Sequence, residues 1–599
     1  MRHYFFNNLL EKGALRMTRI CKNTAAMAAL FGMAAAISFS CTGCPQQNLP
    51  FKALETVTAE DGSTWERVVE PGFGNDNNIS VAAIGEFLGN MYATTRNDAE
   101  GTEVWKTSGD TWQQVQIVSG ETNGIYGNSM INNLWSKMIV FNGKLYVGFS
   151  SGMQGSVLHS SGCEIWRFDG TVWEPVVSDR VDTDAQGTIT AIAGCADNDG
   201  DITAEITDAS KNWEADQWAG GVLQITSGEG AYRRFDIVSN TADTLTVQQN
   251  ETSGDYGREY TVCGSTHYSN PFPAYEYDLG PVASGDSYGI GMGSDENGFG
   301  DYWNKTITEM LIFDGKLYVS TGLNYDHGAQ VWYSEDGETW QVTEPPNSFG
   351  NYHTDVNYKD SLKAVSSSIS DIGISDVSGE ELLYAGGTGT TGEKGKCARM
   401  AIHTDTGWEL IVDADVDDNE TGTNENGFGD GMSCEMATGN YMAWSIQHYR
   451  DKLYIGINSL GGTRVLYTPS GSAEDGSWFV SVGAGTAYPV GFDGKLVDTD
   501  DPLLMGTYRN IAANLFVFGD VLYAGVIAQK SEKTQTGTPL WKTADGVIWT
   551  LVTDNSFGRN AALAFEGFAT FNDTLYVGVN MASSSQSNEE GATIFRLAR

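Results

Sequence analysis

The sequence predicts an all-β protein in which seven small antiparallel sheets form a ring, a seven-bladed β-propeller. The first observation is internal repetition at a spacing of tens of residues, which is typical of repeat architectures. A strand with an apolar residue followed by tyrosine recurs at Met91–Tyr92, Leu145–Tyr146, Leu317–Tyr318, Leu383–Tyr384, Leu453–Tyr454, Leu522–Tyr523 and Leu575–Tyr576. In the clearest units, Asn-Gly or Asp-Gly joins the first two strands and Asp-Gly the last two, and both pairs favour tight hairpins.

The second observation concerns how the ring closes. A closing strand with tryptophan before an apolar pair ends six units, at Trp112, Trp173, Trp340, Trp408, Trp478 and Trp549. The seventh unit stops at 594–599 without such a strand, whereas residues 60–69 near the N-terminus have the missing pattern. We therefore expect the N-terminal strand to complete the seventh sheet, which leaves no free sheet edge.

The turns between the third and fourth strands carry a recurring motif. It reads Ser-Glu-Asp-Gly-Glu-Thr-Trp at 334–340, Thr-Ala-Asp-Gly-Val-Ile-Trp at 543–549 and Ala-Glu-Asp-Gly-Ser-Thr-Trp at 59–65. This motif resembles the Asp-box (BNR) repeats of sialidase-like propellers, although it is one residue shorter between Asp and Trp. The resemblance covers most of the chain outside the leader and one insertion. It implies a fold and little about activity, because such boxes are structural.

Residues 1–43 are interpreted as a leader. Thr18–Lys22 is positively charged, Ala25–Phe39 is apolar but too short to span a bilayer, and small residues precede Cys44. This resembles a bacterial lipoprotein signal with Cys44 as the lipidated residue and Met17 as the true start; an ordinary secretory signal is the alternative. No aspartate follows Cys44, and by resemblance to lipoprotein sorting rules this implies the outer membrane.

The rest of the chain divides into a tether at 44–58 and three further segments. Residues 59–181 hold the first two units and the strand that closes the seventh, 182–284 are an insertion containing a β module at 188–264, and 285–599 hold the other five units. The connections from second to third and from fourth to first strands are long, and both classes emerge on the same face. We expect binding on this long-loop face, because binding residues concentrate on loops held by a rigid scaffold.

The amino-acid composition limits the classes of partner that the protein can bind. Acidic residues outnumber basic ones by 77 to 35, giving a formal net charge of −42. Phosphate backbones would be repelled, so nucleic acid is excluded as a partner, and contact with a membrane is expected only through the lipid anchor. The predicted partner is a protein or a carbohydrate. Export permits disulfides, and the expected pairs are Cys195–Cys263 and Cys397–Cys434, with Cys163 left as a buried free thiol.

Two sets of residues are candidates for ligand binding at the mouth of the ring. Asparagines end the loops that lead into the first strands, at Asn78, Asn133, Asn304, Asn510 and Asn560, and three tryptophans lie at or before those strands, namely Trp135, Trp303 and Trp444. The alternatives are loop-capping hydrogen bonds for the amides and burial against the next sheet for the rings. Five of the loops between fourth and first strands open with a Phe-Gly pair, at 73–74, 299–300, 349–350, 428–429 and 557–558, which predicts a positive-φ turn and a ring packed against the rim.

Metal binding and catalysis have weaker candidates. Four histidines fall in long loops, at His159, His267, His327 and His353, and the latter two have nearby carboxylates at Asp326 and Asp355. Imidazole and carboxylate together could bind a transition metal or perform acid–base chemistry. Alternating carboxylates suggest calcium at Asp197, Asp199 and Asp201 and at Asp413, Asp415 and Asp417, although the EF-hand spacing fails and solvated turns are the alternative. His403 and His448 are predicted to be structural.

No catalytic motif decides the function. The sequence has no phosphate-binding loop and no His-Glu-x-x-His, and its arginines are scattered. A binding platform for a protein or glycan on the long-loop face is therefore favoured, with no cofactor. The alternative is a secreted hydrolase or lyase that uses the His/Asp loop cluster or an unrecognised carboxylate pair.

Overall fold

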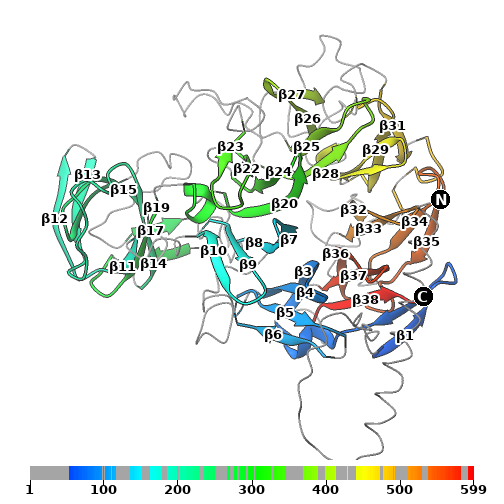
Figure 1. The fold of residues 1–599 in the computed structure, drawn as a ribbon, viewed down its shortest axis with the longest axis horizontal. Helices are drawn as coiled ribbons and strands as arrows, with labels where there is room; N and C mark the ends of the chain where they lie inside the picture. Colours follow the sequence, from blue (N-terminus) through cyan, green and yellow to red (C-terminus); the bar gives the residue numbers. More distant parts are fainter. Residues whose placement is uncertain are drawn as a thin grey trace, which may run out of the picture. The chain divides into compact units, whose positions relative to one another are not determined.

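The computed structural model describes residues 53–599 except 98, 100, 110, 117–134, 152–161, 179–184, 199–200, 229–233, 250–265, 270–275, 280–281, 292–293, 302–303, 325–327, 344–367, 389–397, 413–427, 429–439, 460, 472–476, 484, 490, 493–509, 529–536 and 582–590. The elements named among these residues are β-strands and two short 3-10 turns (Figure 1). The predicted all-β class is confirmed. Nothing in this part of the chain forms an apolar helix long enough to span a bilayer.

Five sheets have four antiparallel strands that follow one another in chain order. The first two are β3 (Asn78–Phe87), β4 (Asn90–Asn97), β5 (Val104–Thr107) and β6 (Gln113–Val115), and then β7 (Ser136–Phe141), β8 (Lys144–Phe149), β9 (Glu164–Phe168) and β10 (Trp173–Val177). The third is β20 (Thr306–Phe313), β21 (Lys316–Gly322), β22 (Val331–Ser334) and β23 (Gln341–Val342). The fourth and fifth are β24 (Ser368–Ser375), β25 (Leu382–Thr388), β26 (Ala398–Thr404) and β27 (Gly407–Val412), and β28 (Asn440–Tyr449), β29 (Lys452–Ser459), β30 (Arg464–Thr468) and β31 (Phe479–Val482).

A nine-stranded sheet joins the C-terminal units to the start of the described chain. Its strands are β32 (Asn510–Phe518), β33 (Val521–Ala528), β34 (Leu540–Thr543), β35 (Trp549–Thr553), β36 (Ala562–Phe571), β37 (Thr574–Met581), β38 (Thr593–Leu597), β1 (Glu55–Thr58) and β2 (Thr64–Arg67). A single residue pair, Ile527 opposite Ala564, links β33 to β36. Strand β2 pairs antiparallel with β38, with Trp65 opposite Leu597 and Arg67 opposite Phe595.

The first strand of each unit contacts the first strand of the next. We call β3, β7, β20, β24, β28, β32 and β36 the inner strands; they contact one another in chain order, and β36 also contacts β3. Apolar clusters fill the space between successive sheets, as where Met91 and Ala93 pack with Tyr576 and Ile594. Because each sheet packs against a neighbour on both faces, its strands are apolar on both sides. The arrangement is propeller-like.

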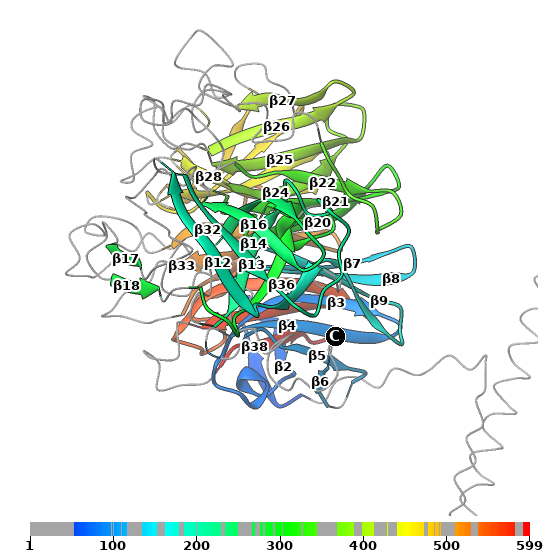
Figure 2. The same ribbon diagram turned by 90° about the vertical axis from the view of Figure 1, so that its left-hand side faces the viewer.

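The insertion forms a separate sheet with its own apolar core. Its strands are β11 (Gln186–Thr188), β12 (Ala191–Asn198), β13 (Asp201–Thr207), β14 (Val222–Ser227), β15 (Arg234–Asn240), β16 (Thr244–Gln249) and β19 (Ser287–Gly291) (Figure 2). Leu223, Phe235 and Leu245 are fully buried in this core. Strands β11 and β19 belong to this sheet although they lie outside residues 188–264, and β17 (Thr266–Ser269) and β18 (Glu276–Leu279) form a separate hairpin.

The Phe-Gly loops that the structure describes adopt the predicted positive-φ turn, and their phenyl rings pack against the sheets as expected. In η1 (Pro71–Gly74) and η3 (Asn297–Gly300), the phenylalanine itself has positive φ, 59° at Phe73 and 61° at Phe299. This left-handed conformation is unfavourable for a bulky residue. The cost is offset by stacking: Phe73 lies 5.1 Å from Trp105 and Phe299 lies 4.8 Å from Trp332, between ring centroids.

The Asp-box turns satisfy their own backbone. Asp336 Oδ1 accepts hydrogen bonds from the N–H groups of Glu338 and Thr339 at 2.8 and 2.7 Å, and Ser334 Oγ accepts one from Gly337 N–H at 2.7 Å. These bonds lower the pKa of Asp336 to about 2. The carboxylate is therefore engaged within the turn, in agreement with a structural role for the motif.

Candidate functional site

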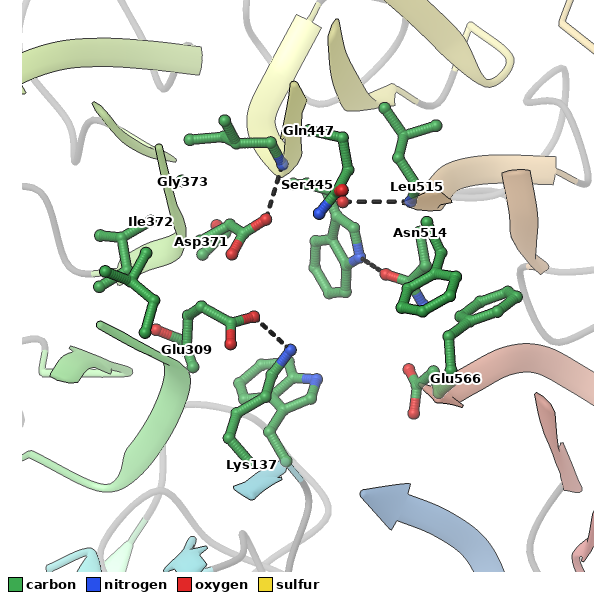
Figure 3. Close-up of a pocket in the computed structure, with 18 of the residues that line it drawn as sticks. Lys137, Glu309, Asp371, Ile372, Gly373, Ser445, Gln447, Asn514, Leu515 and Glu566 are labelled. Atoms are coloured by element: carbon green, nitrogen blue, oxygen red, sulfur yellow. Dashed lines mark hydrogen bonds and ion pairs between the residues drawn. The ribbon is translucent and has the colours of Figure 1, made fainter. Parts of the chain in front are cut away.

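A cavity of about 480 Å³ lies among the inner strands, and all seven of them contribute to its wall. This volume is within the range of small-molecule sites, roughly 300–1,000 Å³. Figure 3 shows side chains from different sheets directed into it, among them Lys137, Glu309, Asp371 and Glu566. Polar groups therefore converge in a space that the apolar strands around it would otherwise leave hydrophobic.

The polar side chains occupy one repeated position. Four residues before the end of each inner strand stand, in chain order, Ala83, Lys137, Glu309, Asp371, Ser445, Asn514 and Gly567. We call these residues, with the adjoining Glu566, the polar belt. At Ala83, Glu309, Asp371 and Ser445 the ladder register shifts immediately before the residue. A bulge redirects the side chain that follows it, which explains how a polar residue is turned into the cavity.

An ion pair crosses from the second sheet to the third. Lys137 Nζ lies 2.6 Å from Glu309 Oε2. Burial alone would lower the pKa of Lys137, but the charges of Glu309 and Asp371 raise it. The lysine is therefore charged at neutral pH, and its charge is shared by two carboxyl groups.

Two further carboxyl groups lie in the wall with weaker partners. Asp371 is 7% exposed, and its Oδ2 accepts a hydrogen bond of 2.6 Å from Ile446 N–H. Burial, and next the charge of Glu309, raise the pKa of Asp371 well above its usual range. Burial also raises the pKa of Glu566 to about 7. Asn580 Nδ2 donates a hydrogen bond to Glu566 Oε2.

Several belt residues also connect neighbouring sheets. Ser445 Oγ accepts a hydrogen bond of 3.1 Å from Leu515 N–H, in the same way that Asp371 accepts one from the next inner strand. Asn514 Nδ2 donates a bond of 2.9 Å to the carbonyl of Phe565, and Asn514 Oδ1 accepts one of 2.7 Å from Trp444 Nε1. These bonds satisfy backbone groups of the neighbouring inner strands.

Two of the predicted tryptophans line this cavity. Trp135 and Trp444 lie 6.0 Å apart between ring centroids, at an interplanar angle of 69°. They come from sheets distant in the sequence, so the chain brings them together only in the fold. His448, predicted to be structural, also lines the cavity, and its Nδ1 lies 2.8 Å from Ser375 Oγ.

The four predicted asparagines that the structure describes do not line the cavity. Asn78 is fully buried, and its Nδ2 donates to Glu103 Oε2 at 2.7 Å, the same oxygen that accepts the Trp105 indole N–H at 2.8 Å. Asn304 makes the equivalent bond to Gln330. The side-chain amide of Asn510 is buried and has no hydrogen-bond partner, and Asn560 is exposed. The buried amides at Asn78 and Asn304 therefore have the loop-capping role.

The remaining predicted residues cannot be placed. Outside the described residues lie Cys44, Asn133, His159, Asp199, Cys263, Trp303, Asp326, His327, His353, Asp355, Cys397, Asp413, Asp415, Asp417 and Cys434. Cys195, Asp197, Asp201 and His267 lie in strands, but their side chains are outside the described part as well. The disulfides, the His/Asp cluster and the calcium sites therefore stay predictions. No group of metal-ligating side chains occurs among the described residues, and Cys163 is a buried free thiol.

Sequence reasoning missed the polar belt. A signal was present, because Lys137, Glu309, Asp371, Asn514 and Glu566 interrupt otherwise apolar strands at nearly the same distance from the following turn. Aligning the units on that turn would have found it. The histidine-containing loops were predicted as a candidate site instead, because imidazole is the commonest metal ligand and a common base near neutral pH.

Comparisons with known proteins give limited information. No family model and no curated protein matches the chain. Phage phi92 endosialidase is 12% identical, with a TM-score of 0.31, over 90% of this chain and 69% of that one. Saccharomyces cerevisiae Sqt1 is 10% identical (TM-score 0.36; 88% and 98% covered), and Trypanosoma rangeli sialidase in complex with sialic acid is 12% identical (TM-score 0.28; 92% and 59% covered). Likeness at this level says nothing about activity.

Proposed function

We propose that the chain is a seven-bladed β-propeller closed by its N-terminal strand. The pairing of β2 with β38 supports this, as does the series of contacts from one inner strand to the next that returns from β36 to β3. Trp65 in β2 is fully buried and packs 5.0 Å from Phe557, so the N-terminal strand belongs to the apolar core of the last sheets. The proposed ring fixes the geometry of the central cavity.

We propose that this protein binds a glycan, with part of the ligand in the central cavity and the rest on the long-loop face. The observation that carries the proposal is the combination of Trp135 and Trp444 with the polar belt around one cavity of about 480 Å³. A sugar presents apolar C–H faces and hydroxyl groups. Aromatic rings pack against the C–H faces, and carboxylates and amides form hydrogen bonds with the hydroxyl groups.

The cavity wall has hydrogen-bond donors and acceptors that the protein itself does not use. Glu309, Glu566 and Lys137 each have donor or acceptor positions beyond the bonds described above. Ser370 Oγ, which lies in the same wall, is shielded and has no hydrogen-bond partner. A protein partner would contact the long-loop face without filling this cavity, and for this reason the geometry favours a glycan over a protein.

The test is binding to a glycan array followed by calorimetry on the glycans that bind. Trp444→Ala should weaken binding about 10-fold or more, since stacking and the burial of a large ring typically contribute 1–3 kcal/mol. Phe479→Ala is the matched control, because Phe479 is an aromatic residue 45% exposed outside the cavity wall. Equal affinity of Trp444→Ala and wild type for every bound glycan would reject the cavity as the site.

We also propose that the protein is exported and anchored in the outer membrane by a lipid on Cys44. The leader composition described above supports this, together with the acidic surface that leaves the lipid as the sole membrane contact. Metabolic labelling with a fatty-acid analogue should mark wild type and not Cys44→Ala. Labelling of both proteins would reject the lipid site.

Glu566 favours a second candidate function, hydrolysis or elimination on the bound glycan. A carboxyl group with a pKa of about 7 can both donate and accept a proton at neutral pH. The His/Asp loop cluster lies outside the described residues and adds no support. Each glycan that binds should be incubated with the protein and its products analysed by mass spectrometry. Cleavage that persists in Glu566→Gln would exclude this residue as the acid.

A further inference from the structure

The cavity wall holds more carboxyl groups than lysines. Three carboxyl groups, Glu309, Asp371 and Glu566, face one lysine, Lys137, and none of the residues that line the described cavity is an arginine. Lys137 forms its ion pair with Glu309. Asp371 is held by a backbone N–H and Glu566 by the amide of Asn580, and both of these donors are uncharged. The wall therefore has carboxyl groups without a cationic partner of their own.

We propose that the ligand of the central cavity carries a protonated amine, and hence that the bound glycan is an amino sugar with free amino groups. This inference rests on the glycan-binding function proposed above and specifies its chemistry. An ammonium group has three donors and one positive charge. At Asp371 or at Glu566 it would supply a counter-ion for that carboxyl group.

Two observations besides the carboxyl groups support an ammonium ligand. The tryptophans Trp135 and Trp444 both line the cavity, with an interplanar angle of 69° between their rings. Ring faces attract cations, and tryptophan does so most strongly. The shielded Ser370 hydroxyl, which has no partner in the protein, adds an acceptor for an N–H group. A carboxylate-bearing sugar would meet the same groups with the opposite sign of charge and is disfavoured.

Binding should be linked to proton release. The charged or titratable groups that face Glu566 across the cavity are Lys137 on β7, Glu309 on β20, Asp371 on β24 and His448 on β28; Arg96 on β4 acts on it from outside the cavity wall. The residues of β3 and β32 in the wall are uncharged. Burial holds Glu566 partly protonated up to about pH 7. A cation stabilises its ionised form, so affinity should rise from about pH 5 to about pH 7 as that proton no longer has to be removed.

The experiment compares three disaccharides by calorimetry. The probes are the β-1,4-linked disaccharide of glucosamine, its N-acetylated counterpart and cellobiose, at about pH 6, below the ordinary pKa of an amine of this kind. We expect the free amine to bind at least about 10-fold more tightly, as hydrogen bonds to charged groups are the stronger class. Titrations in two buffers with different ionisation enthalpies should show proton release for this probe alone.

Variants separate the inference from a general loss of folding. Glu566→Gln and Asp371→Asn keep side-chain oxygens that can accept from Asn580 and Ile446, and they should weaken binding of the free amine much more than binding of cellobiose, so that the preference for the amine is lost. Glu409→Gln, at an exposed position on the outer strand β27, is the matched control and should retain the preference. Equal binding of all three disaccharides would overturn the amine inference and leave glycan binding intact. No binding of any sugar would overturn both.

Discussion

Replacing the Asp-box glycine Gly546 by alanine tests whether one sheet locks onto the next through its tyrosine. Gly546 has a φ of +76°, and a Cβ built on it would overlap Tyr454 Oη and lie 2.5 Å from Tyr454 Cζ. Tyr454 belongs to the preceding unit, and its side chain is fully buried. The new methyl group therefore has to displace a buried tyrosine that has nowhere to move.

The Asp-box glycine Gly62 is the matched control. It has nearly the same φ, +81°, but a Cβ there meets nothing within 4 Å. Gly62→Ala should cost only the left-handed penalty, about 1–2 kcal/mol. Gly546→Ala should lower the free energy of unfolding by that amount and by a further 1–3 kcal/mol or so because of overpacking. The difference between the two variants isolates the contact between the sheets.

The assay is urea denaturation followed by tryptophan fluorescence, with the midpoints of wild type and both variants compared at constant slope. Tyr454→Phe in the Gly546→Ala background should recover part of the loss, because it removes Oη and leaves the ring. Equal destabilisation by the two alanines would refute the reasoning. The same geometry recurs where Gly337 meets Tyr146 of the preceding unit, so a refutation would apply there too.

Three further predictions follow from buried groups. Trp65→Ala should lower the free energy of unfolding by roughly 3–5 kcal/mol in urea, because a fully buried ring of the N-terminal strand is lost. Wild type should lose stability relative to Glu566→Gln as pH rises from 4.5 to about 7, because in this range the Glu566 carboxyl group ionises in the unfolded state and not in the folded state. The free energy of unfolding should fall by roughly 3 kcal/mol over this range and stay constant above it. Glu103→Ala should cost roughly 2–3 kcal/mol by thermal melting, because the buried Asn78 amide and the Trp105 indole N–H lose one shared acceptor.

Each of these predictions has a result that would contradict it. Unchanged melting of Trp65→Ala would mean that the N-terminal strand does not contribute to the cooperative unit. For Glu566, the stability difference between variant and wild type should disappear below pH 4.5, where both states are protonated, and a difference independent of pH would show a packing effect. Glu103→Gln keeps an acceptor oxygen and should be nearly neutral; a loss equal to that of alanine would reject the hydrogen-bond account.

Much of the fold could be predicted because the repeated turns have their own chemistry. The Asp-Gly hairpins, the Leu-Tyr strands and the Phe-Gly loops each define local geometry through a few residues, and these local geometries are the ones observed. The positive φ of Phe73 itself was not expected, since the permissive residue in such a pair is glycine. Here the stacking of Phe73 on Trp105 overrides the backbone preference. That contact depends on a strand some thirty residues away.

The cavity could not be predicted in the same way. Alternation with period two indicates which residues share a face, but a bulge breaks that alternation at the position where the belt residue turns inward. In the sequence, Asp371 therefore appears to be one more polar residue in a strand. Its proximity to Glu309 depends on the packing of two inner strands whose register no local signal specifies. The loop tryptophans were identifiable because the entry to a strand is easier to locate than its interior.

The double role of the polar belt limits where a ligand can bind. Asn514 already uses both its oxygen and its nitrogen to connect Trp444 with Phe565, so its atoms are committed to holding sheets together. Lys137 and Glu566 make fewer contacts with the neighbouring sheets, and a residue with fewer structural obligations can change partner at a smaller cost. Changes of hydrogen-bond partner on ligand binding should therefore concentrate on Lys137 and Glu566, whereas Trp444 and Asp371 should contact the ligand without giving up the bonds that hold their sheets. On the proposed closed ring, specificity can vary only at the positions that do not hold neighbouring sheets together.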